Sequence, residues 1–126
     1  MNQEYIDWIK DGEHDRLSQL EQLRQISIAG VSNWLNEVPS PQCVLDAINV
    51  SGVLEACGFL RVRISPSTSV NGGAMLEYDS EGVYNCIGLF NDGGIVHLVS
   101  HNEDRQTGIT EYTSIGSLID DLGNTL

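Results

Sequence analysis

Apolar residues in the first half of the chain recur every three or four positions, which is the spacing of an amphipathic helix. A short set consists of Tyr5, Ile6, Trp8 and Ile9. A longer set follows a polar stretch and consists of Leu17, Leu20, Leu23, Ile26 to Ile28, Val31, Trp34, Leu35 and Val38. Proline cannot continue a helix, so we expect the longer helix to end at Pro39.

A third helix is predicted to begin at Ser40-Pro41, because serine is a favourable N-cap and proline suits the first helical position. We expect it to stop at Gly58. Glycine has a low helix propensity, so Gly52 is an unfavourable residue inside this span. The apolar positions of the predicted helix are Val44, Leu45, Ile48, Val53 and Leu54.

The second half of the chain alternates apolar and polar residues, as strands with one wet face do. This alternation is clear in FLRVRIS, residues 59–65, and in AMLEYDS, residues 74–80. A turn at residues 79–82, a hairpin at residues 84–101 and a strand at residues 107–114 follow. A short terminal helix is predicted from Ile115, Leu118, Ile119 and Leu122.

The order of these elements predicts one α+β domain that covers residues 1–126. Its helical half spans about 1–58, an antiparallel meander of about five strands spans about 59–114, and a closing helix spans about 115–123. We expect the N-terminal helices to pack on one face of the sheet. The other face then needs an explanation.

The hairpin at residues 84–101 decides what that other face contains. If Asp92-Gly93 are the central residues of a type I′ turn, Leu89 lies opposite Val96 and Ile87 opposite Leu98. The core face would then be uniformly aliphatic, with Ile87, Leu89, Val96 and Leu98. We expect this face to pack on the helices, because a slip of one residue would expose all four side chains.

The predicted outer face is too apolar for a wet surface and too polar for a core. It consists of Tyr84, Cys86, Gly88, Phe90, Ile95, His97, Val99 and His101. Neighbouring strands would add the charged residues Arg61, Arg63, Glu77, Asp79 and Glu111. Three interpretations remain open: a solvated face with cross-strand ion pairs, a protein–protein interface, or a small-molecule or metal site.

We interpret this face as a candidate binding surface. The candidate binding residues are Tyr84, Cys86, Phe90, Ile95, His97, Val99, His101, Arg61, Arg63, Glu77 and Asp79. When no other partner is present, a second copy of the chain is expected to cover Tyr84, Phe90, Ile95 and Val99, because open apolar strands invite pairing. The sequence therefore also predicts a homodimer.

The charge balance narrows the class of partner. Six Lys and Arg against 18 Asp and Glu give a net charge of −12. Such a protein repels phosphate backbones and anionic headgroups, so nucleic acid and membranes are not expected partners. A basic protein would instead be attracted to it. Acidity also serves solubility, and charge alone does not separate these two explanations.

The chain is expected to reside in the cytoplasm. No apolar stretch approaches the length of a membrane span, and the first residues lack the basic start and apolar core of a signal peptide. Cys43, Cys57 and Cys86 are odd in number and lack a CxxC spacing, which is typical of separate thiols in a reducing compartment.

Chemically reactive arrangements are weak in this sequence. His97 and His101 lie about 13 Å apart along one strand and cannot chelate a single ion. Cys86 and His97 would be diagonal neighbours in the predicted register, but no acidic residue or anion hole supports a nucleophilic pair. SVNGGAM, residues 69–75, lacks the Lys and the helix of a phosphate loop. We predict no catalytic residues, no metal and no cofactor, and no enzyme activity.

One segment supports a resemblance to a known family. Residues 76–122, LEYDSEGVYNCIGLFNDGGIVHLVSHNEDRQTGITEYTSIGSLIDDL, combine an aromatic-acidic strand, a tight hairpin, a Thr-Gly strand with Glu111-Tyr112 and a closing helix. In this order the segment resembles the small α+β immunity proteins that protect bacteria against polymorphic toxins, the TriTu type in particular. The resemblance implies a cytoplasmic bacterial protein that blocks a toxin by binding it.

Two functional hypotheses follow. The first is an acidic cytosolic binding module that occludes a basic protein partner, such as a toxin, through the outer face of its sheet. The alternative is a small-molecule-binding or accessory protein carried on a mobile bacterial element, with a pocket between the helices and the sheet. A cluster of Tyr78 and Tyr112 beside Trp34 would favour the pocket.

Overall fold

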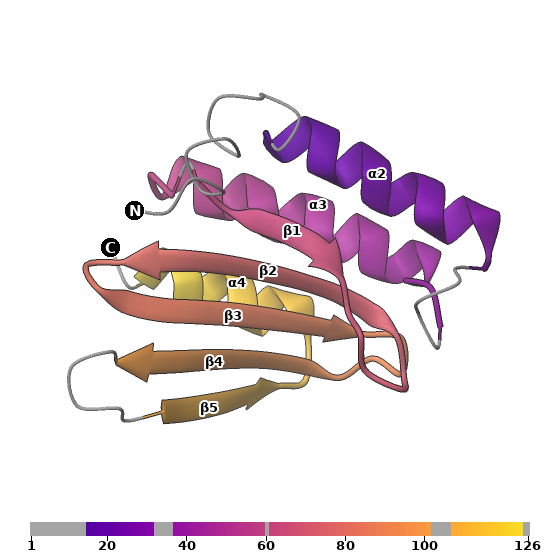
Figure 1. Ribbon diagram of the computed structural model, residues 1–126. Helices are drawn as coiled ribbons and strands as arrows, with labels where there is room; N and C mark the ends of the chain where they lie inside the picture. The colour runs from indigo at the N-terminus through magenta and orange to yellow at the C-terminus, as the bar shows by residue number, and fades with distance from the viewer. Residues whose placement is uncertain (1–14, 32–36, 60, 102–106, 125–126) are drawn as a thin grey trace.

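The computed structural model describes residues 15–31, 37–59, 61–101 and 107–124. These form helices α2 and α3, a five-stranded antiparallel sheet and helix α4, which confirms the α+β class (Figure 1). The elements are α2 Arg16–Ala29, α3 Pro41–Ala56, β1 Arg63–Pro66, β2 Gly73–Ser80, β3 Val83–Phe90, β4 Ile95–His101, β5 Thr107–Tyr112 and α4 Ile115–Asn124. The short helix predicted near Tyr5 lies outside the described residues.

Helix α2 is shorter than its apolar period predicts. Asp15 caps its start by accepting a hydrogen bond from the Ser18 N–H at 2.8 Å. Gly30 ends it in the left-handed conformation, with φ 74°, and donates its N–H to the Ile26 carbonyl. The prediction that the helix continues to Pro39 is therefore wrong, because Gly30 terminates it first.

Helix α3 begins as predicted. The Ser40 side chain accepts a hydrogen bond from the Cys43 N–H, and Pro41 occupies the first helical position. The helix ends at Ala56, just before Gly58. Leu45 and Ile48, two of its predicted apolar positions, are exposed, whereas Val44 and Leu54 are buried.

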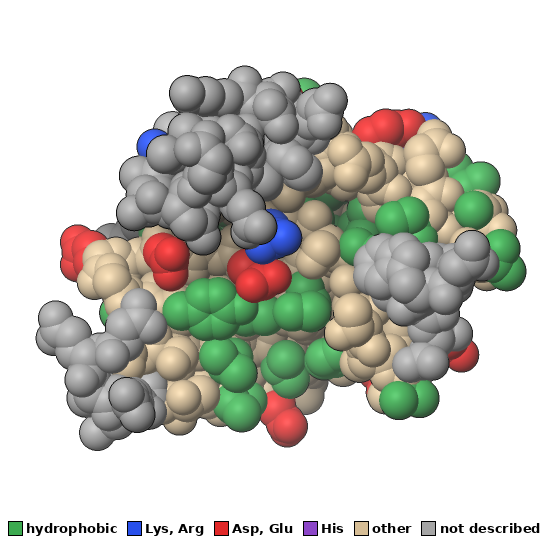
Figure 2. All heavy atoms as spheres, viewed as in Figure 1, with side chains coloured by type: hydrophobic (Ala, Val, Ile, Leu, Met, Phe, Trp, Pro, Cys, Tyr) green, Lys and Arg blue, Asp and Glu red, His purple; other side chains and the backbone are tan. Residues whose placement is uncertain are grey.

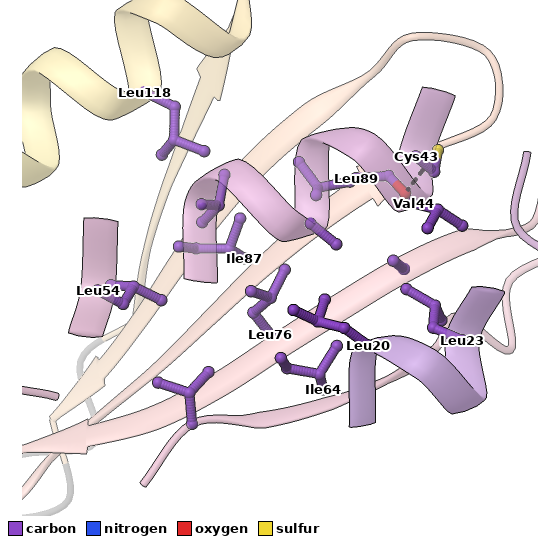
Figure 3. Close-up of a cluster of buried hydrophobic side chains, with 14 of the residues drawn as sticks. Leu20, Leu23, Cys43, Val44, Leu54, Ile64, Leu76, Ile87, Leu89 and Leu118 are labelled. Carbon is purple, nitrogen blue, oxygen red and sulfur yellow. Dashed lines mark hydrogen bonds between the residues drawn. The ribbon is translucent and has the colours of Figure 1, made fainter. Parts of the chain in front are cut away.

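The strands follow one another in the order β1-β2-β3-β4-β5, so the sheet is a simple antiparallel meander. Helices α2, α3 and α4 all lie on one side of it (Figure 1). The core fills the space between these layers, and Leu76, Ile87 and Leu89 from the sheet meet Leu23, Leu54 and Leu118 from the helices (Figure 3). The Cys43 thiol lies in this core and donates to the Leu89 carbonyl at 3.4 Å.

The two hairpins use different turns. Ser80 pairs with Val83 across a two-residue turn in which Glu81 has φ 52° and Gly82 φ 80°. Positive φ at both central residues is the mark of a type I′ turn. The β3–β4 connection instead has three residues, Asn91, Asp92 and Gly93, and it is closed by a hydrogen bond from the Phe90 N–H to the Gly94 carbonyl.

The longer loop corrects the predicted register. The Gly93 N–H donates to the Phe90 carbonyl and Gly93 has φ 94°, as in a type I turn followed by a left-handed glycine. Leu89 therefore pairs with Ile95, not with Val96, and Cys86 pairs with Leu98. The predicted pairing was wrong by one residue, so every side chain of β4 lies on the face opposite to the one predicted.

Candidate protein-binding face of the sheet

The side of the sheet away from the three described helices carries a mixed apolar and charged surface, which we call the open face. The alternation of side chains along paired strands assigns its members. They are Arg63, Ser65, Met75, Glu77, Asp79, Tyr84, Cys86, Gly88, Phe90, Val96, Leu98, Ser100, Thr107, Ile109 and Glu111.

Apolar side chains form a continuous strip on the open face. Cys86 lies opposite Leu98, and Leu98 lies opposite Ile109 on the next strand. Directly opposed side chains on one face of a sheet are close enough to touch. Figure 2 shows hydrophobic side chains gathered over β3, β4 and β5 on this side of the molecule. Ile109 is 65% exposed, so the strip reaches solvent at its outer end.

Phe90 completes the strip by covering a glycine. A Cβ atom at Gly88 would lie 3.0 Å from the Phe90 ring and 3.1 Å from a Val96 methyl carbon. The ring therefore occupies the space above Gly88 that a larger side chain would need. Gly88 and Phe90 together form a flat apolar area beside Val96.

Charged groups flank the strip on the β1 and β2 side. Arg63 lies opposite Glu77, and the Tyr84 hydroxyl donates a hydrogen bond to Glu77 Oε2 at 2.7 Å. Burial, together with this bond to a carboxylate, raises the pKa of Tyr84 well above its usual value. Tyr84 is thus held as a neutral phenol. Arg61 precedes β1 and is exposed, and Asp79 lies opposite Tyr84.

The Cys86 thiol offers no activated nucleophile. It is half-buried on the open face, and burial raises its pKa above the ordinary value. The thiol therefore stays protonated at neutral pH. His97 lies opposite Ile87 on the helix-facing side, so the two groups occupy different faces of the sheet. The diagonal Cys86–His97 arrangement considered from the sequence is wrong.

His97 belongs to a polar cluster between the sheet and the helices. Its Nε2 lies 2.9 Å from Asn85 Oδ1 and 3.5 Å from the Tyr78 hydroxyl. The Asn85 amide nitrogen is already bonded to the Val83 carbonyl, so Asn85 Oδ1 accepts and His97 Nε2 donates. Burial lowers the pKa of His97, and the nearby Asp121 carboxylate partly offsets this. The imidazole is consequently neutral and structural.

The structure thus separates the candidate residues other than Arg61, which precedes β1, into two groups. Arg63, Glu77, Asp79, Tyr84, Cys86 and Phe90 share the open face. Ile95, His97, Val99 and His101 lie on the helix-facing side, and Ile95 is part of the core. The face predicted for a second copy therefore loses Ile95 and Val99, and dimerisation itself stays a prediction.

Sequence reasoning missed seven members of the open face: Ser65, Met75, Val96, Leu98, Ser100, Thr107 and Ile109. Val96 and Leu98 were assigned to the core through the register error. The alternation in AMLEYDS and TGITEYTS could have placed Met75 beside Glu77 and Ile109 beside Glu111. Because Met75, Val96, Leu98 and Ile109 are apolar, the open face carries a continuous apolar strip and not the mixture of residue types that the sequence predicted.

The alternative hypothesis, a small-molecule-binding protein, requires a pocket between the helices and the sheet, and the described residues line two hollows. One of about 290 Å³ lies between the start of α2 and the end of α3, and it is lined by Asp15, Arg16, Leu17, Glu55, Phe59 and Val62. A smaller one of about 50 Å³ lies between the start of α3 and the β3–β4 loop. Tyr78 and Tyr112 lie on the helix-facing side of the sheet, whereas Trp34 is outside the described residues.

The same part of the chain contains neither a metal-binding cluster nor a membrane-spanning helix. Among the described residues, no group of three or more His, Cys, Asp and Glu side chains is arranged to hold a metal ion. Glu103 and Asp104, the acidic residues that follow His101 in the sequence, lie outside that part. None of the described helices has the length and apolar character needed to span a membrane.

Comparison with known proteins adds no family to this description. No protein-family model, no curated protein and no solved structure matches the chain.

Proposed function

We propose that the chain is an acidic, cytoplasmic, non-enzymatic binding module that occludes a basic protein partner through its open face. The apolar strip carries this proposal: Cys86, Leu98 and Ile109 lie side by side on the sheet face that none of the described helices covers. Contiguous exposed apolar side chains on a folded domain are typical of interfaces.

The composition of the strip favours a protein over a small ligand. It lies on a strand surface between an aromatic ring, Phe90, and a neutral phenol, Tyr84, which stand near opposite ends of β3. Aromatic residues that can be desolvated are the usual anchors of protein–protein interfaces. Charged residues at the border, such as Arg63 and Glu77, would form a polar rim.

The charge supports a basic partner. At −12 the chain attracts cations over distances of about a Debye length, roughly 8 Å in physiological salt. Glu77, Asp79 and Glu111 place part of that charge on the open face. An immunity-like role against a basic toxin agrees with this charge and with the resemblance of residues 76–122 to toxin-immunity proteins.

The proposal can be tested by affinity capture with matched surface variants. The tagged chain is incubated with a lysate of the organism that carries the gene, and bound proteins are identified by mass spectrometry. The open-face variant combines Leu98→Ser and Ile109→Ser. The control combines Ile28→Ser and Leu45→Ser, which replace residues that are 64% and 55% exposed on α2 and α3.

We expect a basic protein whose recovery falls about tenfold or more with the open-face variant and is unchanged with the control. Recovery should also decrease as salt is added, because screening weakens the attraction. A partner that is lost equally with both variants would contradict the open face as its site. A partner that binds more tightly in high salt would contradict the electrostatic part of the proposal.

A further inference from the structure

The two edges of the sheet are treated differently by the rest of the fold. At the β1 edge, the Gln19 side chain of α2 donates to the Val62 carbonyl at 2.9 Å and accepts from the Ile64 N–H at 2.7 Å. Gln19 is only 4% exposed. Its amide therefore bonds two of the backbone groups that point outward from this edge, in the way that a neighbouring strand would. This contact blocks the addition of a strand at β1.

The β5 edge has no equivalent contact within the described ranges. β5 is the last strand of the sheet, and Thr107 to Glu111 are all exposed. Antiparallel ladders alternate between residues that bond inward and outward, and the bond from the Phe90 N–H to the Gly94 carbonyl sets this phase. When this alternation is followed across the β4–β5 register, the backbone N–H and C=O groups of Thr107, Ile109 and Glu111 point away from β4.

The surroundings of this edge are acidic. The strands and helix next to it, residues 95–101 and 107–124, contain Glu111, Asp120 and Asp121 and no Lys or Arg. The Tyr112 hydroxyl donates to Asp121 Oδ2 at 2.8 Å, which holds one carboxylate beside the end of β5 on the helix-facing side. Glu111 places another on the open face. A segment laid along β5 would meet a carboxylate on either side.

We propose that the partner binds by adding a basic, extended segment as a further strand alongside β5. This inference rests on the proposed function and specifies how the partner is held. Backbone groups of Thr107, Ile109 and Glu111 would pair with the added strand, as in other strand-addition complexes. Apolar side chains on one side of the added strand would extend the strip beyond Ile109, and basic ones on the other would lie near Asp121.

A second copy of the chain fits this edge poorly. It would bring a further charge of −12 to the first. Pairing β5 with another β5 would also bring Glu111 and Asp121 of each copy to the same edge. Like charges that face one another across strands are destabilising. A basic segment meets the same backbone groups without that repulsion.

The test uses a synthetic peptide of about eight residues that alternates Val and Lys. Amide chemical shifts and hydrogen exchange of the labelled chain are measured during titration. We expect slower exchange at the N–H groups of Thr107, Ile109 and Glu111, because the added strand would cover them. Two control peptides are used: one N-methylated at alternate residues on the edge that faces β5, and one with Glu in place of Lys.

A pair of substitutions separates backbone pairing from side-chain contact. Ile109→Ala removes the side chain alone, whereas Ile109→Pro also removes the outward N–H, which an edge strand tolerates. We expect Ile109→Pro to weaken peptide binding about fivefold to tenfold beyond the effect of Ile109→Ala. Thermal unfolding and the amide spectrum check that each variant is folded, and the N-methylated peptide tests the same point on the unaltered chain.

The outcomes separate this inference from the proposed function. Equal binding of the N-methylated and plain peptides, or equal effects of the two Ile109 variants, would overturn strand addition. If Leu98→Ser still abolished capture of the basic protein in that case, the open face would stand without the edge. A dimer in sedimentation that Ile109→Pro dissociates would instead assign the edge to a second copy and refute the basic segment.

Discussion

Asn91 connects three segments that are distant in the sequence. Its side-chain amide donates to the Val38 carbonyl at 2.9 Å and accepts from the Ser40 N–H at 2.8 Å, and its own N–H donates to the Gly72 carbonyl at 3.2 Å. The tip of the β3–β4 hairpin is thereby attached to the start of α3 and to the β1–β2 loop. Asn91 is thus both a residue of the β3–β4 turn and a link between the layers of the fold.

Asn91→Asp is expected to destabilise the fold by about 1–3 kcal/mol, because a carboxylate would face the Val38 carbonyl without a proton to donate. Asp92→Asn is the matched control: its side-chain oxygen can still accept from the Gly94 N–H, so we expect little change. Urea unfolding of both variants measures the difference. Equal stability of the two would show that the Val38 contact contributes nothing.

The buried His97 predicts a dependence of stability on pH. Burial lowers its pKa below the ordinary 6.5 in the folded state. As the pH falls through 6.5, His97 therefore binds a proton more readily in the unfolded chain than in the folded one. This contribution to stability is present above pH 6.5 and is lost below it, at no more than about 1.4 kcal/mol per pH unit. The groups that face His97 are Asn85, the neutral phenol of Tyr78 and the Asp121 carboxylate.

Urea unfolding at several pH values between about 5 and 8 measures this effect. His97→Gln should flatten the dependence, because glutamine can still donate to Asn85 Oδ1 but carries no titrating group. The same substitution at the exposed His101 is the matched control. An unchanged pH dependence in His97→Gln would assign the effect to other groups.

At the scale of elements, the sequence predicted most of the fold but assigned the side chains of β4 to the wrong faces of the sheet. The start of α3 was predictable because Ser40-Pro41 combines a cap with a residue suited to the first turn. The β4 assignment failed because Asp92-Gly93 is compatible with either a two-residue or a three-residue loop, and only the closing Phe90–Gly94 bond distinguishes them. Both β4 faces carry apolar residues, so hydrophobicity could not correct the choice.

The same ambiguity limited the prediction of the site. The β2 and β3 members of the open face other than Met75 were identified, because Glu77, Asp79 and Tyr84 lie on strands joined by a short turn of clear register. On β4, the residues of the open face were assigned to the core, and the residues that face the helices were assigned to the open face. The chain also contains a Gly30 that could have ended α2, but the apolar spacing continues past it and conceals the stop.

The corrected register can be tested by two neighbouring substitutions. Ile95 is buried against the helices, so Ile95→Ala should cost about 2–5 kcal/mol of unfolding free energy. Val96 is half-exposed on the open face, and Val96→Ala should cost less than about 1 kcal/mol. Urea unfolding compares the two. The reverse order of effects would restore the two-residue turn and its face assignments.

At the scale of the whole molecule, charge is expected to govern how fast a partner arrives and the apolar strip how long it stays. The net charge of −12 acts at long range, whereas Phe90 and Tyr84 act only on contact. Two of the basic residues on α2 already contact carboxylates, Arg16 with Glu55 and Arg24 with Glu21. Each of these ion pairs is neutral as a unit, so they leave the net charge of −12 and its attraction for a basic protein unchanged.

These two contributions can be separated by measuring rates against the captured basic protein at several salt concentrations. Glu77→Lys combined with Asp79→Lys should slow association and flatten its salt dependence, because two of the three carboxylates of the open face become ammonium groups. Phe90→Ala and Tyr84→Ala should mainly speed dissociation, by about 1–3 kcal/mol if each is an anchor.

The control for the charge reversal combines Glu37→Lys and Asp46→Lys, which make the same change in net charge at a loop and on α3. Because attraction between exposed charges is screened beyond about a Debye length, this control should slow association less than the change at Glu77 and Asp79. If both pairs slow association equally, the net charge alone attracts the partner and the open face has no electrostatic role of its own. If neither pair slows it, encounter does not depend on charge, and the partner would be recognised by the apolar strip and the β5 edge alone.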